Sequence, residues 1–399
     1  MIRPRQLARV SLLACLPCLL ALGCDNDASL AFADDPPGQW FHGDFHVHAT
    51  GASNDTGGES FPEDIKETAI SRGLDFIVLT DHSNSTGSDP DTLDEDPALF
   101  NMGPEFPYWD RAAELSDESF LMIDGNEISP RAVGDKVPTG HIGCIPENLE
   151  TFDRSSPIVD RPRGSVTGGE ALADALDRGC FTVINHPYSL PHVSYDWTSY
   201  DYDALEVWNG TPPGFVVTDF WGYDAWMCDL LAGRTVAAVG GSDNHRIHIE
   251  PPGEGLTNPA LGYPTTAVYA EEFTWASIMK GLRRGHTAIF EGQSRIALDA
   301  YDAQGKHAEG DRVRWIRIRA TVDPLAEAPH VVLNRATTCV DNRPDKVNDV
   351  SYETLLDQVL EPGETVDLKV AIQGEPGVYA AELATNIHYG ALSRALVIP

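Results

Sequence analysis

The chain has 399 residues, is 42% hydrophobic and carries a formal net charge of −33. This hydrophobic content can build a sizeable core, which argues against global disorder, and the length favours two domains. The acidic balance argues against nucleic acid as a partner, because binding a phosphate backbone normally requires a basic face. We therefore expect a small-molecule substrate.

The N-terminus has the pattern of an export signal. Three arginines within the first nine residues precede an apolar stretch, 10–23, that is too short to span a bilayer comfortably. The stretch ends in Ala-Leu-Gly-Cys, which resembles a bacterial lipobox with Cys24 as the lipidated residue; a plain secretory signal is the alternative. We predict a signal peptide over 1–23 and an acidic, Pro/Gly-rich tether over 24–39. The protein would then be exported and attached to the membrane of the bacterial envelope by its lipid alone, or otherwise be periplasmic or secreted.

From residue 40 to residue 292, short apolar runs alternate with helical stretches. Runs such as Phe-Ile-Val-Leu at 76–79 are apolar on both faces, as are strands of a parallel sheet covered by helices. Repeated strand–helix alternation is typical of a (β/α) barrel or a doubly wound sheet. The expected strands are 41–48, 75–81, 120–128, 141–145, 181–185, 204–208, 236–240 and 266–269. The expected helices are 62–72, 108–115, 168–178, 220–231 and 275–284, the third opening on a capping box at Thr167 and Glu170.

After Gly292 the pattern changes to short β-rich segments separated by Gly, Pro and Asp turns, which predicts a small β-sandwich over 293–399. Its expected strands are 296–301, 315–322, 330–333, 365–372, 378–385 and 393–398.

Four cysteines remain once the signal and the lipidated Cys24 are set aside: Cys144, Cys180, Cys228 and Cys339. A disulfide is permitted outside the cytoplasm, but their spacing assigns none. We expect buried free thiols.

Histidines and carboxylates gather at the ends of the predicted strands. Each lies at the C-terminal end of a strand or up to three residues past it, except His141, which opens its strand. That edge is where barrels and open α/β sheets place catalytic groups. The segments are His46-Val-His48, Thr80-Asp81-His82, Gly125-Asn-Glu127, Gly140-His141, Asn185-His186-Pro187 and Gly241-Ser-Asp243-Asn-His245.

The spacing within these segments suits metal binding. Residues i and i+2 of an extended chain point to the same side, so His46 and His48 can bind one ion together, and so can Asp243 and His245. Imidazole and carboxylate ligands suit Zn, Mn and Fe. A single histidine after a strand is more often an ordinary hydrogen-bonded residue, but one shared metal site explains six such strand ends better than coincidence does.

Taken together, these motifs resemble the polymerase and histidinol phosphatase (PHP) superfamily of metallohydrolases, and most closely its carbaryl-hydrolase-like (CehA/McbA-like) branch. The resemblance spans about 40–292 and is carried by 43–48, 79–84, 185–187, 206–210, 241–245 and 281–285.

The resemblance implies a distorted (β/α)7 barrel of the PHP type with two or three divalent ions. It places the first ion on His46, His48, Glu127 and Asp243. It places the second ion on Glu127, His141 and His186. A third ion would lie on His82 and His245, with Asp55 or Asn54 in the position where the family has a further His or Asp.

The implied reaction is hydrolysis of a phosphoester, or of a carboxylic or carbamate ester or amide, by a metal-activated water. Asp81 or Asp243 would orient a ligand or accept a proton. A nuclease of the same superfamily is one alternative, and a non-catalytic surface lipoprotein that binds a ligand or carbohydrate is another. Structural zinc sites are usually rich in Cys, so a set of His and carboxylates favours catalysis.

Overall fold

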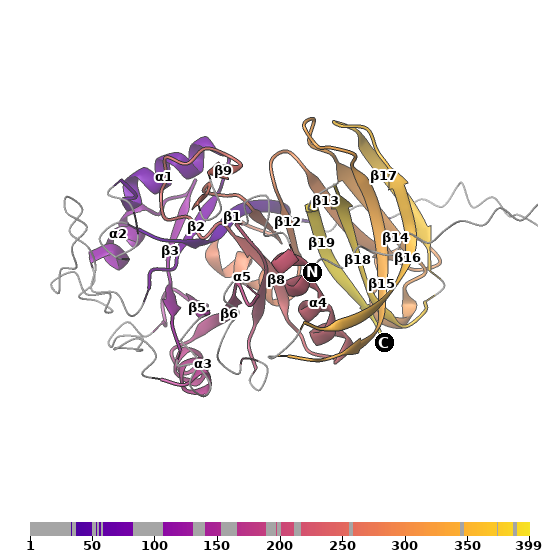
Figure 1. Ribbon diagram of the computed structural model, residues 1–399, viewed down its shortest axis with the longest axis horizontal. Coiled ribbons are helices and arrows are strands. Elements are labelled where there is room, and N and C mark those ends of the chain that lie inside the picture. Colours follow the sequence, from indigo (N-terminus) through magenta and orange to yellow (C-terminus); the bar gives the residue numbers. More distant parts are fainter. Residues whose placement is uncertain are drawn as a thin grey trace, which may run out of the picture.

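The computed structural model describes residues 33, 37–49, 53, 56, 59–82, 107–130, 140–152, 166–188, 197, 201–210, 217–254, 258–343, 347–372, 374–385 and 389–399. These residues form a mixed α/β structure that is rich in strands and has few helices (Figure 1). The predicted signal peptide, most of the tether, Cys24 and Asp55 lie outside the described residues. Among the described helices, none combines the length and the hydropathy needed to cross a membrane.

Two sheets hold the strands that the sequence predicts before residue 292. In the first, β1 (Gln39–Val47) pairs in parallel with β2 (Phe76–Leu79), which pairs in parallel with β3 (Leu121–Asp124). The other edge of β1 continues through antiparallel β11 (Thr265–Ala270) and β12 (Thr287–Phe290). The second sheet has the order β4 (Asn126–Ile128), β5 (His141–Pro146), β6 (Cys180–Asn185), β7 (Ala204–Asn209) and β8 (Ala237–Gly241).

The two sheets approach each other at two places. Gly125 alone separates β3 from β4, and a Cβ added there would lie 2.9 Å from the carbonyl oxygen of Leu79. Past β8, the amide of Asp243 donates to the carbonyl oxygen of His46 at 2.8 Å, which joins the ends of β8 and β1. Between the described strands the hydrogen-bonded ladder is interrupted at these places, so the closed (β/α)7 barrel stays a prediction.

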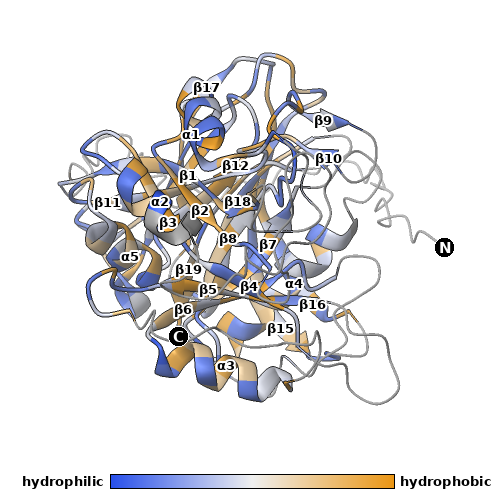
Figure 2. Ribbon diagram, turned by 90° about the vertical axis from the view of Figure 1, so that its left-hand side faces the viewer, coloured by the Kyte–Doolittle hydropathy of each residue, from blue (hydrophilic) through white to orange (hydrophobic). Residues whose placement is uncertain are grey.

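Five helices lie close to their predicted positions: α1 (Pro62–Ser71), α2 (Pro107–Leu115), α3 (Gly168–Asp177), α4 (Val217–Leu231) and α5 (Trp275–Arg283). The capping box at the start of α3 is confirmed, because Thr167 and Glu170 cap each other's backbone amides. Hydrophobic and hydrophilic residues alternate along α3 in Figure 2, and the buried ones include Leu172 and Ala175. Helix α4 packs on β7, and α5 packs on β11.

The C-terminal strands form two layers around one core. The three-stranded sheet consists of β13 (Arg295–Tyr301), β14 (Trp315–Thr321) and β17 (Thr365–Ala371). It packs through Leu298 and Ile318 against Leu333 and Leu383 of the other layer. That layer consists of β15 (His330–Val340), β16 (Asp349–Val359), β18 (Gly377–Ala384) and β19 (Tyr389–Ile398).

The second layer does not end where the predicted domain boundary lies. Strand β19 pairs with β12 through Ile289 opposite Leu392, so one nine-stranded sheet runs from β16 to β3. Strands β12 and β16 are not among the predicted strands. The side chains of β16 are mostly exposed, so its sequence lacks the apolar alternation that marks a half-buried strand. The separate domain over 293–399 stays a prediction.

The expectation of free thiols is wrong. Cys144 and Cys180 form a disulfide between β5 and β6, with their Cα atoms 5.1 Å apart, and Cys228 and Cys339 form one between α4 and β15 at 5.4 Å. Both separations lie in the ordinary range for disulfides. Strand pairing and helix packing bring the partners together over 36 and 111 residues, which spacing in the sequence does not reveal.

Candidate metal centre

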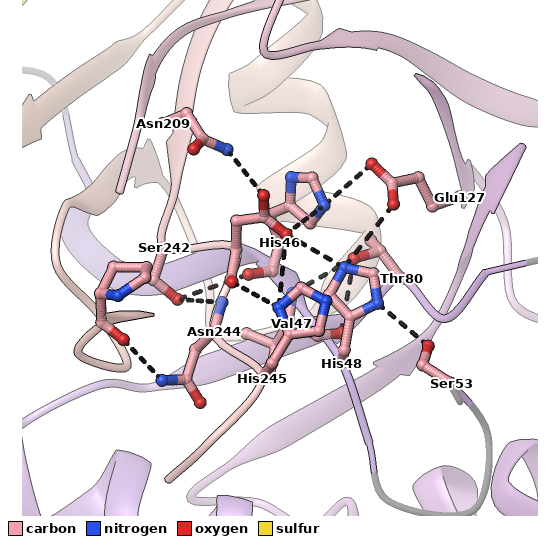
Figure 3. A network of polar contacts seen from close by, with 12 residues as sticks. His46, Val47, His48, Ser53, Thr80, Glu127, Asn209, Ser242, Asn244 and His245 are labelled. Carbon is pink, nitrogen blue, oxygen red and sulfur yellow. Dashed lines mark hydrogen bonds and ion pairs between the residues drawn. The ribbon is translucent and has the colours of Figure 1, made fainter. Parts of the chain in front are cut away.

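Six histidines and two carboxylates meet where the ends of β1, β4 and β8 come together. Figure 3 labels four of them, His46, His48, Glu127 and His245. The side-chain nitrogen and oxygen atoms of all eight form four overlapping groups, and within each group the atoms lie within 4.8 Å of one another. The structure thus brings together every predicted metal ligand that it describes. These are His46, His48, His82, Glu127, His141, His186, Asp243 and His245.

The first predicted ligand set is compact. The Oδ1 atom of Asp243 lies 3.2 Å from Nε2 of His46 and 3.2 Å from Nε2 of His48. The Oε1 atom of Glu127 lies 3.0 Å from Nε2 of His46, and its Oε2 atom lies 3.6 Å from Nε2 of His48. His46 and His48 share one group with Asp243, as the i and i+2 spacing predicts. Asp243 and His245 do not share a group, because His245 lies with His48 and His82.

The second predicted set surrounds the same carboxylate. The Oε1 atom of Glu127 lies 2.9 Å from Nδ1 of His141 and 3.1 Å from Nε2 of His186. The two imidazole nitrogens are 3.2 Å apart. His141 reaches the cluster although it opens its strand, because β5 runs antiparallel to β4 and β6 and so begins at the edge where they end.

The third predicted set lies next to His48, which it shares with the first set. The rings of His48 and His245 stack with their centroids 4.1 Å apart, and the ring of His82 lies 4.7 Å from that of His48. The Nδ1 atom of His82 also lies 3.0 Å from Oε2 of Glu127. Asp55, the remaining predicted ligand, lies outside the described residues, so the described part of this set holds His48, His82 and His245.

The polar atoms at the centre of this cluster fit a bound cation. Within the described part of the chain, Nε2 of His46, Nε2 of His48 and Oε2 of Glu127 are buried and lie 3.0–3.2 Å from other polar atoms without a well-aligned hydrogen bond. Leaving a buried polar atom unpaired costs about 1–3 kcal/mol. Divalent ions would satisfy all three atoms at once, and the imidazole and carboxylate donors suit Zn, Mn or Fe.

The electrostatics of the cluster favour ligand forms that bind metal. Burial opposes ionisation of Glu127, but His141, His46 and His82 hold its pKa well below the usual value. Asp243 is only partly exposed, which opposes its ionisation, but His46, His48 and His245 hold its pKa well below the usual value. Burial lowers the pKa of His48 to about 3 and that of His141 to about 4, so both are neutral at pH 7. Ionised carboxylates and neutral imidazoles are the forms that coordinate metals.

His46 differs because carboxylates surround it. Burial lowers its pKa, but Asp243, Glu127 and Glu206 together raise the pKa well above the usual value. In the absence of metal, a proton on His46 therefore balances these carboxylates. A metal ion would replace that proton.

Glu206 is a site residue that the metal-ligand prediction does not include. One of its oxygens, Oε1, accepts from Nδ1 of His46 at 3.0 Å, and the other, Oε2, accepts from the amide of His186 at 2.7 Å. The side-chain amide of Asn209 donates to Oε2 as well, at 3.2 Å. Glu206 thus fixes one ligand from each of the first two sets. The sequence does hold a signal for it, because a carboxylate stands within the otherwise apolar strand β7.

Asp81, predicted as a catalytic group, is buried behind the ligands. Its Oδ1 atom accepts from the amide of Ala49 at 2.7 Å and from Oγ of Ser53 at 3.1 Å. Ser53 in turn is bonded to Nδ1 of His48 at 3.0 Å. These contacts are those of a residue that positions His48 through Ser53, and a role of Asp81 in proton transfer stays a prediction.

Two of the ligand residues have positive φ angles, which residues other than glycine rarely adopt. His186 has φ +30° and Asp243 has φ +55°. Such conformations cost free energy and persist where the surroundings enforce them. Here the enforcing contacts are the bond from the His186 amide to Glu206 and the bond from the Asp243 amide to the carbonyl of His46.

No family model and no curated protein matches the chain. Among solved structures, the chain is similar to a two-domain protein from Bacteroides vulgatus that contains a predicted PHP-like metal-dependent phosphoesterase. The identity is 18%, 92% of this chain and 97% of that chain are covered, and the TM-score is 0.45. The chain is also similar to the lesion-specific endonuclease Q of Pyrococcus furiosus, at 15% identity over 61% of this chain and 56% of that chain, with a TM-score of 0.39.

A third similar structure is PsfC of Pseudomonas syringae, at 19% identity over 57% of this chain and 82% of that chain, with a TM-score of 0.36. TM-scores below 0.5 do not establish a shared fold, so the function proposed below rests on side-chain geometry. Nothing in these neighbours supports the narrower resemblance to the carbaryl-hydrolase-like branch.

Proposed function

We propose that this protein is an exported, metal-dependent hydrolase of the PHP type that cleaves a phosphoester, or a carboxylic or carbamate ester or amide. The observation that carries the proposal is the position of Glu127. Its Oε1 atom lies within 3.1 Å of nitrogens of His46, His141 and His186. Its Oε2 atom lies 3.0 Å from His82 and 3.6 Å from His48. A carboxylate with imidazoles around both oxygens is suited to bridge two ions.

Bound ions would lower the pKa of a water and neutralise charge that develops on the bond under attack. The chain's own residues would hold the ligands in place and handle the proton. Glu206 fixes His46 with its Nε2 atom facing the cluster, and Ser53 does the same for His48. The side chain of Asp243 is 27% exposed whereas that of Glu127 is 1% exposed. Asp243 is therefore the carboxylate that faces the open side, where it would accept a hydrogen bond or proton from the attacking water.

Both ester classes in this proposal come from the family resemblance, and the geometry of the site does not select between them. The PHP superfamily as a whole points to phosphoesters, and the carbaryl-hydrolase-like branch points to carbamate-type esters. Bound divalent ions would supply positive charge to neutralise an anionic substrate.

The rival proposal is a surface lipoprotein that binds a ligand or carbohydrate and holds its metals as structure. Structural zinc sites are usually closed, four-coordinate and rich in Cys. The cluster contains no Cys, and its eight residues exceed what one closed site needs. These features favour catalysis.

The export part of the proposal is supported by the two disulfides, because disulfides persist mainly in oxidising compartments. It includes lipidation at Cys24, after a signal peptide over 1–23 and before a tether over 24–39. It also includes a catalytic domain over 40–292 and a β-sandwich-like domain over 293–399.

The test uses the mature protein, stripped with chelator and reloaded with Zn, Mn or Fe. Elemental analysis gives the metal content, and a panel of aryl phosphates, aryl phosphodiesters, aryl acetates and aryl carbamates gives the reaction class. We expect more than one bound ion and turnover of at least one ester class, which is lost on chelation and in His48→Ala. His330→Ala, at a histidine of β15 far along the sheet from the cluster, serves as the control and should keep full turnover.

Metal binding without turnover of any ester would favour the structural alternative. A protein that binds no metal would overturn both proposals.

A further inference from the structure

A cavity of about 440 Å³ lies between helix α5 and the C-terminal strands. Its walls come from the start of β1, from β11 and α5, and from β13, β14 and β19. The volume lies in the range of pockets that bind small organic molecules.

The cavity is basic, although the chain as a whole carries a net charge of −33. Five Lys or Arg side chains line it, against three carboxylates, so an excess of positive charge faces the cavity. The cations are Lys280, Arg284, Arg312, Arg319 and Arg394, and the carboxylates are Glu271, Asp299 and Glu309.

Within the described part of the chain, two of the cations have no carboxylate partner. Asp299 accepts from Arg319 at 2.7 Å and lies 3.6 Å from Arg394, and Lys280 lies 3.3 Å from Glu271. By contrast, the described residues include no ion pair of Arg284 or Arg312, and both side chains are exposed. A guanidinium presents a planar fork of donors that matches a carboxylate or phosphate. Arg284 and Arg312 can therefore turn to a ligand without breaking a bond inside the protein.

The rest of the wall suits the body of an organic ligand. Trp40 and Tyr269 both line the cavity and meet edge to face, with their ring centroids 5.3 Å apart. Gly281 lets α5 lie close to β11, since a Cβ there would be 2.6 Å from the carbonyl oxygen of Tyr269. Partly exposed aromatic rings offer a large apolar contact area to a ring or hydrocarbon group.

The cavity is separate from the metal cluster. Trp40 stands near the start of β1 and His46 near its end. Six residues of strand span about 20 Å at about 3.3 Å per residue. One small ligand cannot contact both sites.

We propose that this cavity binds a small organic oxyanion, in which a carboxylate or phosphate is attached to a ring or hydrocarbon body. Arg284 and Arg312 hold the oxyanion, and Trp40 and Tyr269 contact the body. This second ligand site does not depend on the hydrolase proposal.

The test is calorimetric titration of the metal-loaded mature protein with phenylphosphonate, with benzoate and with neutral benzamide. We compare the wild type with Arg284→Gln/Arg312→Gln and with the control Lys306→Gln/Lys369→Gln, which removes two exposed lysines outside the cavity. We expect phenylphosphonate or benzoate to bind the wild type and the control alike, and to bind the arginine variant about tenfold more weakly, because a charge-assisted hydrogen bond is lost. Benzamide should bind none of them.

Oxyanions that bind at the metal cluster would titrate equally in all three proteins, so they cannot imitate this result. The proposal is overturned if the wild type binds neither anion, or if the arginine variant loses less than threefold in affinity. Thermal unfolding and circular dichroism check that each protein is folded, and the single variants Arg284→Gln and Arg312→Gln replace the double variant if it does not fold.

Discussion

The imidazole of His46 lies 3.0 Å from the carboxylate of Glu206 through its Nδ1 atom, and both side chains are almost fully buried. Since a carboxylate accepts the hydrogen bond, Nδ1 carries the proton and Nε2 faces Glu127 and Asp243. Contacts of this kind commonly set the tautomer and orientation of metal-binding histidines.

Loss of the Glu206 carboxylate should therefore weaken metal binding. We expect Glu206→Gln to lower the metal affinity by about 10–100-fold, the usual effect of removing such a partner. Metal affinity is measured by competition with a chromogenic chelator. Glu118→Gln, at an exposed position, is the control and should bind metal as the wild type does. Equal affinities in the two variants would show that Glu206 does not orient a ligand.

Glu127 and His245 should differ in how many ions they hold. Glu127 belongs to two of the four groups of clustered atoms and contacts imidazoles of the remaining ones, whereas His245 belongs to one. We expect Glu127→Gln to lose more than one ion and His245→Ala to lose at most one, by elemental analysis after dialysis against metal-free buffer. Identical stoichiometry in the two variants would contradict a bridging role of Glu127.

Gly241 should tolerate no side chain. A Cβ at this position would lie 2.4 Å from Cβ of His46 and 3.0 Å from Oε1 of Glu206. We expect Gly241→Ala to displace His46, and so to reduce both metal content and turnover by at least about tenfold. In the control Gly390→Ala, the nearest atom is the hydroxyl of Ser294 at 3.1 Å, which can rotate away. Retained metal binding in Gly241→Ala would show that the backbone relaxes at no cost to the site.

The disulfide Cys228–Cys339 should stabilise the contact between α4 and β15. It closes a loop of 111 residues, and removing a disulfide typically costs about 2–5 kcal/mol. We expect Cys228→Ser/Cys339→Ser to unfold at a lower denaturant concentration than the wild type. A reductant should destabilise the wild type by more than it destabilises the variant, because the variant has only Cys144–Cys180 left to lose. A wild type that is insensitive to reductant would contradict both disulfides.

His286, in the wall of the basic cavity, should titrate well below an ordinary histidine. Burial, and after it the charges of Arg394 and Arg284, lower its pKa to about 4. The unfolded chain, with a histidine pKa of about 6.5, binds this proton more readily, so His286 reduces stability as pH falls from about 6.5 towards 4.

NMR titration of the imidazole measures this pKa directly. Arg284→Gln should raise it, because a repelling charge is removed, and a bound oxyanion should raise it for the same reason. A pKa near 6.5 in the unliganded wild type would contradict the burial of this ring.

The sequence by itself predicts the helices and strands that have a periodic pattern of apolar residues. Apolar runs and turn residues mark the five helices and most strands up to residue 292, although not β12, and Thr167 and Glu170 fix the start of α3. Strand β16 escapes prediction, because its exposed side chains give no alternation. The pairing of β19 with β12 escapes it too, because register between strands about a hundred residues apart depends on packing.

For the site, too, the sequence predicts the local features and the tertiary structure decides the contacts between distant segments. The spacing His46-Val-His48 and the positions of the other residues at strand ends are local, so the sequence by itself identified eight of the residues that cluster. The sequence cannot measure distances between segments, and therefore the tertiary structure alone brings Glu127 within reach of five imidazoles, sets Glu206 behind His46 and joins Cys228 to Cys339. Local periodicity follows from backbone geometry, whereas these contacts depend on how the chain packs as a whole.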